Sequence, residues 1–262
     1  MAVTPEVVAA IAELYLEAER RAMPAEPIRE RHPEINEEDA YAIQAELLRR
    51  KQSDGAMVAG YKAGATNAAA QANFGLSQAV YGTLLRHGQV LDGGSIERRD
   101  LIHPRVECEV AFRMAADLAG PGVTPEAAMA AVAGALAAFE IVDSRTVGWG
   151  VKMPEMIADS VFAARYVVSE QLVPVAGLDL AGLGVTLLKN GEQVAHATGA
   201  NVLGSPANAL AWLVNRMAAH GRALRAGDIV LAGSLTPLVA AAAGDSFEAR
   251  FDALGAVRVR FV

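Results

Sequence analysis

An alternation of apolar and polar residues near the C-terminus constrains the fold of this chain most strongly. Apolar side chains alternate with charged ones over residues 247–251 and, after a turn through Gly255, again over residues 257–261. Side chains that alternate in this way point to opposite faces of a strand. The pattern predicts a half-buried β-hairpin. From Gly60 onward, frequent glycines, short apolar runs and turn signals favour further strands.

Helix signals concentrate in the first 55 residues. Thr4-Pro5 supplies an N-cap hydroxyl and a proline at the first helical position, and Asn36 can cap a second helix. The stretch between them, Pro24 to Pro33, is expected to be a polar loop. Two later helices are predicted to begin at Thr124-Pro125 and Ser205-Pro206. Helices followed by strands with a few further helices predict an α+β fold rather than a regular βαβ alternation.

Composition excludes several classes of protein. The 262 residues suit one large domain, and 30 acidic against 23 basic residues give a net charge of -7, so no nucleic-acid partner is expected. The single cysteine, Cys108, excludes an internal disulfide and predicts a reducing, cytoplasmic location. The longest apolar run, residues 127–139, is shorter than the roughly 20 residues that span a bilayer. A charged fraction of 20%, below the typical ~25%, favours a homo-oligomer.

Two glutamates in the segment His103–Phe112 carry the first candidate chemistry. If this segment is a strand, Glu107 and Glu109 share one face, because side chains two residues apart point the same way. Two carboxylates held side by side face bulk water, share a proton with one raised pKa, or bind a cation. The pattern alone does not choose among these arrangements, and a solvated polar face is the ordinary one.

A third acidic residue, Glu140, follows a helix-like run of small residues and precedes two apolar residues that are expected to be buried. A buried carboxylate needs a partner because an isolated buried charge is costly. One interpretation pairs Glu140 with Arg145. The other makes it a third ligand beside Glu107 and Glu109. Three carboxylates without a cysteine or histidine cluster would select Mg²⁺ or Mn²⁺ rather than Zn²⁺.

Lys62 lies between glycines in the segment Gly60–Thr66. In a confined site a lysine can have its pKa lowered and act as a general acid or base, although a surface lysine with a snorkelling stem is the ordinary alternative. The segment Gly227–Pro237 is predicted to be a strand that runs into a turn containing Ser234 and Thr236. Such a turn can receive a carboxylate or be an ordinary turn. Nucleotide-binding glycine motifs and a serine-hydrolase elbow are absent from the sequence.

Several motifs from about Gly60 to the C-terminus together resemble the 2-keto-4-pentenoate hydratase branch of the fumarylacetoacetate hydrolase superfamily. The motifs are G-Y-K-A-G-A-T at 60–66, Y-G-T-L at 81–84, H-P-R-V-E-C-E-V-A-F at 103–112, E-I-V-D-S-R at 140–145, I-A-D at 157–159 and L-G-S-P-A-N-A-L-A-W-L at 203–213. Segments 227–234 and 243–245 also fit. Each motif alone is weak, and their combination is specific to the branch.

This resemblance implies a mixed β-roll catalytic domain with flanking helices over residues 56–262, usually oligomeric, and a helical region, residues 1–55, packed on it. The residues implied to ligate a divalent metal, Mg²⁺ or Mn²⁺, are Glu107, Glu109 and Glu140. Lys62 matches the acid-base lysine of the family. The residues predicted to bind the substrate are Ser234, Thr236, Arg145 and Asp159.

The implied activity is hydration of a short 2-hydroxy-2,4-dienoate, such as 2-hydroxypenta-2,4-dienoate, to a 4-hydroxy-2-oxoacid in the breakdown of aromatic compounds. One alternative is a 4-oxalocrotonate-type decarboxylase that uses the same metal site and works beside a hydratase partner. A second is a non-catalytic 2-oxoacid-binding homologue.

The sequence departs from the hydratase pattern in two places. Many hydratases have Asp-Phe-Gly where this chain has Val80-Tyr81-Gly82. They also commonly have Asp-Asn-Ala-Ser-Ser-Gly where residues 159–164 are Asp-Ser-Val-Phe-Ala-Ala, which removes hydroxyls and adds Phe162. We therefore expect an intact metal-binding half of the site and an altered water-handling half.

Overall fold

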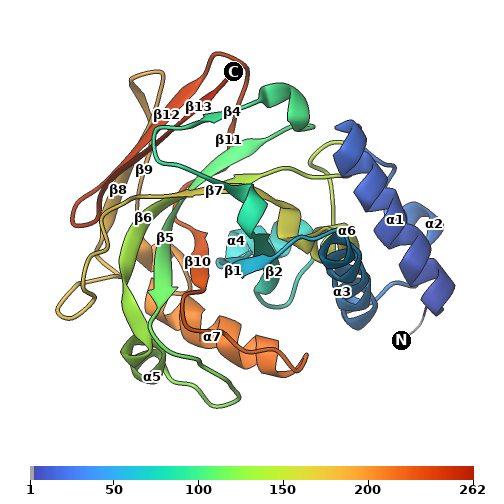
Figure 1. The fold of residues 1–262 in the computed structure, drawn as a ribbon, viewed down its shortest axis with the longest axis horizontal. Helices are drawn as coiled ribbons and strands as arrows, with labels where there is room; N and C mark the ends of the chain where they lie inside the picture. The colour runs from blue at the N-terminus through green and yellow to red at the C-terminus, as the bar shows by residue number, and fades with distance from the viewer. Residues whose placement is uncertain (1–2) are drawn as a thin grey trace.

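A curved, mixed eight-stranded sheet forms the centre of the molecule in a computed structural model that describes residues 3–262 (Figure 1). The strands lie in the order β2-β1-β10-β5-β6-β7-β3, and β11 pairs with β5. They are β1 (Val58–Gly64), β2 (Val80–Leu85), β3 (Gln89–Val90), β5 (Arg105–Met114), β6 (Val132–Val142), β7 (Ala163–Val168), β10 (Ile229–Ser234) and β11 (Val239–Ala240). Most neighbours are antiparallel, but β1 runs parallel to β10 and β3 runs parallel to β7.

A second sheet of five strands packs on the first, in the order β4-β13-β12-β8-β9. Its strands are β4 (Ser95–Ile96), β8 (Gly184–Lys189), β9 (Glu192–Thr198), β12 (Ser246–Phe251) and β13 (Gly255–Phe261). β12 and β13 are the predicted C-terminal hairpin, and their apolar side chains, Phe247, Ala249, Phe251, Val257, Val259 and Phe261, are buried. Because both strands contact β6 of the first sheet, the two sheets enclose one apolar core, as in the expected β-roll.

The N-terminal helices lie at one side of the sheets (Figure 1). They are α1 (Pro5–Arg21), α2 (Ile28–Arg31) and α3 (Glu37–Ser53). Thr4 caps α1, and Asn36 forms a capping box with Asp39 at the start of α3, as the sequence predicts. The expected loop over residues 24–33 instead contains α2, whose Arg29 amide donates to the buried Glu155 carboxylate at 2.9 Å. A contact with a distant segment therefore orders this stretch.

The remaining helices are short connections, apart from α7. They are α4 (Ala68–Phe74), α5 (Pro125–Ala130), α6 (Met153–Ala158), α7 (Pro206–Ala218), and the single turns η1 (Arg86–Gly88), η2 (Arg98–Asp100), η3 (Ser160–Phe162) and η4 (Gly199–Asn201). Thr124 and Ser205 cap α5 and α7, as predicted. Helix α3 packs on α6, which joins the N-terminal helices to the rest of the fold. Among residues 3–262, no helix is long and apolar enough to cross a membrane.

The small-residue run before Glu140 is a strand and not a helix. Residues 132–142 form β6, and all of them except Ala133 are buried. β6 pairs with β5 on one side and β7 on the other. The helix propensity of alanine amounts to only a few tenths of a kcal/mol per residue, so two hydrogen-bonded neighbours and burial between the sheets override it.

Candidate functional site

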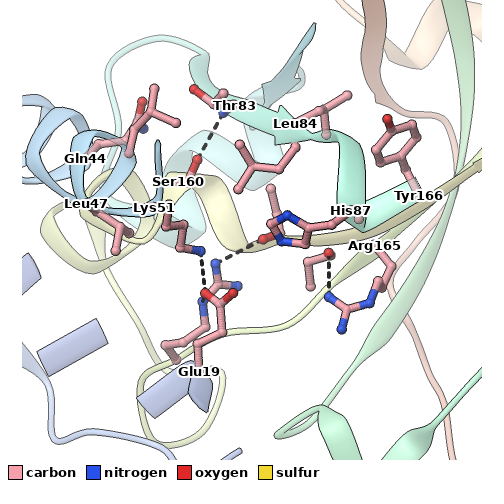
Figure 2. Close-up of a pocket in the computed structure, with 16 residues that line it drawn as sticks. Glu19, Gln44, Leu47, Lys51, Thr83, Leu84, His87, Ser160, Arg165 and Tyr166 are labelled. Carbon is pink, nitrogen blue, oxygen red and sulfur yellow. Dashed lines mark hydrogen bonds and ion pairs between the residues drawn. The ribbon is translucent and has the colours of Figure 1, made fainter. Parts of the chain in front are cut away.

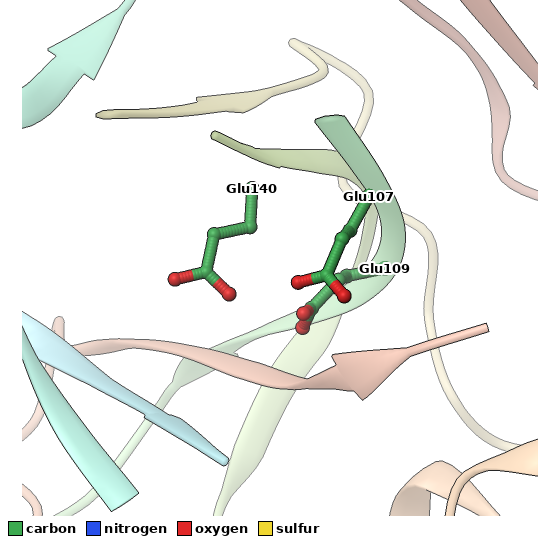
Figure 3. Close-up of side chains that lie close together, drawn as sticks. All are labelled: Glu107, Glu109 and Glu140. Carbon is green, nitrogen blue, oxygen red and sulfur yellow. The ribbon is translucent and has the colours of Figure 1, made fainter. Parts of the chain in front are cut away.

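Three carboxylates converge where β5 and β6 pair. Glu107 and Glu140 are directly opposite each other in the antiparallel register, and Glu109 follows two residues along β5. One oxygen from each residue lies within 4.8 Å of the others, and Figure 3 shows the three carboxylates facing one another. Glu109 and Glu140 are fully buried, and Glu107 is partly exposed. The structure brings these three predicted ligands together and excludes the solvated polar face.

The carboxylates of this cluster are short of hydrogen-bond donors. Among the described residues, the Oε1 atoms of Glu109 and Glu140 have no hydrogen-bond partner. Burial raises the pKa of Glu107 to about 7. Burial and the neighbouring carboxylates raise the pKa of Glu109 well above its ordinary value. Hard divalent cations bind such groups of carboxylate oxygens, so these residues fit Mg²⁺ or Mn²⁺.

Lys62, on β1, is the cation that contacts this cluster. Its Nζ lies 2.8 Å from Glu140 Oε2 and donates to the Val161 carbonyl at 2.9 Å. Glu140 therefore pairs with Lys62 and not with Arg145. Burial acts to lower the pKa of Lys62, but Glu140, Glu107 and Glu109 outweigh it and raise that pKa above its ordinary value. This direction is opposite to the lowering that burial alone would give, and the burial of Lys62 excludes the surface lysine.

A strained turn holds the Val161 carbonyl in place. Ser160, Val161 and Phe162 all have left-handed backbones, with φ values of 50°, 54° and 63°. A β-branched residue rarely adopts this conformation. Two glycines make room for the turn: a Cβ at Gly82 would lie 2.2 Å from the Ser160 carbonyl oxygen, and one at Gly64 would lie 2.4 Å from a Val161 methyl carbon. Sequence reasoning missed this turn, although both glycines lie in motifs that it quoted.

The glycine-hydroxyl turn at the end of β10 also meets the cluster. The register between β10 and β5 shifts before Ser234, and the Gly233 amide donates to Glu109 Oε2 at 2.7 Å. The Ser234 hydroxyl donates to the Thr236 carbonyl at 2.7 Å. Thr236 Oγ1 accepts from the Cys108 amide at 3.1 Å.

A cavity of about 240 Å³ opens onto Glu107 and Lys62. Its other lining residues are Ala63, Gly64, Ala65, Thr66, Asn67, Ala70, Asn73, Phe74, Val142, Trp149, Met156, Val161, Phe162, Ser234, Thr236, Pro237 and Leu238. Pockets that hold drug-sized ligands usually measure about 300–1,000 Å³, so this cavity suits a smaller molecule. Ser234, Thr236 and Phe162 are thus placed beside the carboxylates, whereas Val80 is fully buried and does not line the cavity.

Arg145 and Asp159, predicted to bind substrate, are not among the residues that line this cavity. Arg145 Nε lies 2.7 Å from Asp159 Oδ1, and the Asp159 carboxylate also accepts from the Arg145 amide at 2.7 Å. The Arg145 guanidinium further donates to the Asp143 and Ala163 carbonyls. These bonds make the pair a structural link, so its placement does not support the predicted role in substrate binding.

Arg145 instead lines a neighbouring pocket between the N-terminal helices and the central sheet. Figure 2 shows that pocket, with Glu19 from α1 and Lys51 from α3 facing each other across it. Lys51 Nζ lies 2.5 Å from Glu19 Oε2. Glu19 also lies 3.8 Å from Arg145 Nε, which is paired with Asp159. Two acids and two bases are therefore close together beside this pocket, and their charges compensate one another.

Comparisons with known proteins agree with this geometry. The model of the fumarylacetoacetate hydrolase C-terminal family matches residues 48–262. The chain is 39% identical to the 2-hydroxyhexa-2,4-dienoate hydratase of Comamonas testosteroni over 94% of each chain. It is 35% identical to the 2-keto-4-pentenoate hydratase of Paraburkholderia xenovorans (98% of this chain, 96% of the relative).

A solved structure matches the whole fold. The 4-oxalocrotonate decarboxylase of Pseudomonas putida G7, complexed with magnesium and adipate, superimposes with a TM-score of 0.96 at 34% identity over 99% of each chain. The similarity confirms the α+β fold and the resemblance drawn from the sequence motifs. The chain belongs to the fumarylacetoacetate hydrolase C-terminal family.

Proposed function

We propose that this protein is a divalent-metal-dependent hydratase that adds water to a 2-hydroxy-2,4-dienoate and yields a 4-hydroxy-2-oxoacid. The observation that carries the proposal is the convergence of Glu107, Glu109 and Glu140 on one point, with Lys62 beside them at the end of a small cavity. The hydratase relatives at 35–39% identity support the reaction class.

Glu107, Glu109 and Glu140 would hold the cation, Mg²⁺ or Mn²⁺. Three carboxylates and the Lys62 ammonium carry a formal charge of minus two, which a divalent cation balances. When bound, the cation draws electron density from the substrate carboxylate and the adjacent oxygen. Ser234 and Thr236, which line the same cavity as Glu107, would bind that carboxylate.

Lys62 is placed to move the proton. For a five-carbon substrate, the enol hydrogen leaves the C2 oxygen and a proton is delivered to C5, which gives the 2-oxo-3-enoate. Water then adds its oxygen to C4 and a proton to C3, so the overall reaction consumes one water and no net proton. The contacts of Lys62 with Glu140 and the Val161 carbonyl fix the ammonium at the cavity.

A spectroscopic assay tests this function. Protein, Mg²⁺ or Mn²⁺ and 2-hydroxypenta-2,4-dienoate are mixed, and the loss of conjugated absorbance is followed with and without EDTA. We expect metal-dependent turnover that Glu109→Ala abolishes with little loss of fold, whereas the exposed Glu192→Ala control retains it. Full activity of Glu109→Ala would contradict the proposed site. Thermal stabilisation by the dienoate without turnover would instead indicate the non-catalytic binder.

A 4-oxalocrotonate-type decarboxylase is the second candidate. It is favoured by Val80, which stands where many hydratases have an acid, and by 37% identity to the 4-oxalocrotonate decarboxylase of Pseudomonas putida. In that reaction the electron pair of the bond to the departing CO₂ enters the conjugated 2-oxo system, and Lys62 supplies the proton that replaces CO₂. If the protein releases CO₂ from 4-oxalocrotonate faster than it hydrates the dienoate, its activity is that of a decarboxylase.

We also propose a cytoplasmic homo-oligomer, and, if the activity is decarboxylation, a complex with a pathway hydratase. The charged fraction of 20% motivates the oligomer. Light scattering on the purified protein measures its mass in solution, and a monomer would contradict this part of the proposal.

A further inference from the structure

One side of the cavity is aromatic. Phe74, Trp149 and Phe162, here called the aromatic wall, all line it. The Phe162 ring centroid lies 5.4 Å from that of Trp149, with an angle of 75° between the rings, and 6.1 Å from that of Phe74. The contact with Trp149 is edge-to-face, and that with Phe74 is tilted; both distances are favourable for aromatic side chains. Met156 and Leu238 line the same cavity, and Thr66, Asn67 and Asn73 add uncharged polar groups, so the aromatic side offers the end of a substrate a mainly apolar surface without charge.

The position of the aromatic wall is fixed by the backbone. Phe162 belongs to the left-handed turn, and its carbonyl accepts from the Asp143 amide at 2.9 Å. The Arg105 guanidinium stacks on the Trp149 ring, 4.5 Å from its centroid, and Trp149 Nε1 donates to the His103 carbonyl at 3.3 Å. These contacts hold the aromatic wall in place, so a ligand meets a preformed surface.

No cation lines the aromatic part of the cavity. Among the described lining residues only Lys62 and Glu107 are charged, and Lys62 is already paired with Glu140. Two further cations lie close to lining residues but are engaged there. Arg105 stacks on Trp149, and Lys152 Nζ donates to the Asn73 carbonyl at 2.6 Å. A carboxylate at the far end of a substrate would lose its hydration at the wall without gaining an ion pair.

We infer that the aromatic wall makes this protein selective for monocarboxylate dienoates with an uncharged, apolar tail, and that it rejects dicarboxylates of the same length. This inference rests on the proposed function, whose substrate class it narrows. It favours hydration of 2-hydroxypenta- and 2-hydroxyhexa-2,4-dienoate over decarboxylation of 4-oxalocrotonate. The wall acts on the tail, whereas the carboxylate cluster acts on the 2-oxoacid end.

Two comparisons set the expected size of the effect. The added methyl group of 2-hydroxyhexa-2,4-dienoate buries further apolar surface, so its kcat/KM should exceed that of 2-hydroxypenta-2,4-dienoate by about fourfold. Replacing that methyl by a carboxylate gives 2-hydroxymuconate, the enol form of 4-oxalocrotonate. Since an apolar pocket already rejects an added hydroxyl by about a hundredfold, the dicarboxylate should lose at least about that factor.

The test measures binding and turnover separately on the full-length protein with Mg²⁺. Dissociation constants are measured by calorimetry for 2-oxohexanoate and 2-oxoadipate, which have equal lengths and differ in the terminal methyl or carboxylate. The kcat/KM is measured for the three dienoates, with the Pseudomonas putida decarboxylase as a positive control for the dicarboxylate. Phe162→Arg supplies a cation at the wall, and Phe162→Leu is its uncharged control. Trp149→Arg and Trp149→Leu repeat the pair away from the left-handed turn.

We expect 2-oxohexanoate to bind at least about a hundredfold more tightly than 2-oxoadipate. Either arginine variant should shift this ratio at least tenfold toward the dicarboxylate, and the leucine variants should keep the wild-type order. Equal affinities in the wild type, or folded arginine variants with an unshifted ratio, would overturn the inference whether or not dienoates are hydrated. Preferential binding of 2-oxohexanoate without turnover of any dienoate would support the inference and overturn the proposed hydratase activity.

Discussion

Two largely buried groups of charges in this molecule differ in their balance of acids and bases. In the carboxylate cluster, Glu107, Glu109 and Glu140 face one cation, Lys62. In the interface cluster, defined as Glu19, Lys51, Arg145 and Asp159, two acids face two bases.

The pKa values of Glu109 and Glu19 differ in the sense that this balance predicts, although burial also raises the pKa of Asp159, in the interface cluster, to about 7. Burial raises the pKa of Glu109, and the neighbouring carboxylates raise it further. Burial also acts to raise the pKa of Glu19, but Lys51 and Arg145 outweigh it and lower that pKa to about 2. Buried charges that pair with one another are stable without a ligand, whereas an excess of buried carboxylates requires a bound cation. We therefore assign a structural role to the interface cluster and a chemical role to the carboxylate cluster.

Replacing one lysine in each cluster should give the largest difference in activity between the two clusters. Lys62→Met removes the proposed acid-base group, so we expect kcat/KM for 2-hydroxypenta-2,4-dienoate to fall by about 10²–10⁴, while the Mg²⁺-bound protein keeps its fold. Lys51→Met, the matched control, should reduce stability and leave kcat/KM within a few fold. Absorbance kinetics and thermal unfolding measure the two effects. Equal losses of activity in both variants would remove the distinction between the clusters.

Arg145→Met tests the structural role of the interface cluster. Removing one partner of a buried ion pair leaves the other charge uncompensated, so the free energy of unfolding should fall by about 3–5 kcal/mol. Adding Asp159→Asn should recover part of that loss, because the orphaned charge is then gone. Urea unfolding of the single and double variants measures both. Unchanged stability with a KM raised more than tenfold would restore the substrate-binding role predicted from the sequence.

Gly82→Ala tests whether the left-handed turn serves the carboxylate cluster. The new Cβ would lie 2.2 Å from the Ser160 carbonyl oxygen and 3.3 Å from Lys62 Cδ, so the turn must move and take the Val161 carbonyl with it. We expect kcat/KM to fall by roughly 30–100-fold, within the range that misplaced catalytic groups cost, while Mg²⁺ affinity stays within a few fold. Gly177→Ala also has a positive φ but meets nothing within 4 Å. It should lose only stability, and an equal activity loss there would refute the positioning role.

The parts of the structure that sequence could predict depend on local patterns. The caps at Thr4 and Asn36 and the hairpin over residues 246–261 follow from side chains a few positions apart. The face shared by Glu107 and Glu109 follows from the period of a strand, and the family resemblance selected Glu140 as their third ligand over its pairing with Arg145.

The parts that sequence could not predict depend on contacts between distant segments. β6 is a strand because two strands flank its alanines, and α2 exists because Glu155 binds its first turn. The left-handed turn is possible only where Gly64 and Gly82 face it. Arg145 was predicted to bind substrate because it lies in a motif, but its partner Asp159 and the nearby Glu19 come from other segments.

The smallest expected difference between the two clusters is in the pH dependence of stability. Without metal, the pKa of Glu107 rises from an ordinary 4.5 to about 7 on folding, so the folded protein binds more protons than the unfolded chain between these values. Glu107 alone should therefore lower the free energy of unfolding by about 2 kcal/mol as pH rises from 5 to 8 in EDTA.

Within the interface cluster, Glu19 should respond on the acid side, whereas Asp159, whose pKa burial raises from 3.8 to about 7, should add to the loss of stability between pH 5 and 8. The pKa of Glu19 falls from 4.5 to about 2 on folding, so its contribution is present above pH 4.5 and is lost as pH falls toward 2. Glu107→Gln should reduce the loss between pH 5 and 8 and leave the acid limb, whereas Glu19→Gln should remove the acid limb and leave the loss between pH 5 and 8. Saturating Mg²⁺ should reduce the loss between pH 5 and 8, because a cation requires the deprotonated carboxylates, and should leave the part that comes from Asp159. Urea unfolding across pH, with EDTA or Mg²⁺, measures the free energy of unfolding on the acid side and between pH 5 and 8. If Mg²⁺ does not change the loss between pH 5 and 8, the raised pKa of Glu107 is unrelated to metal binding.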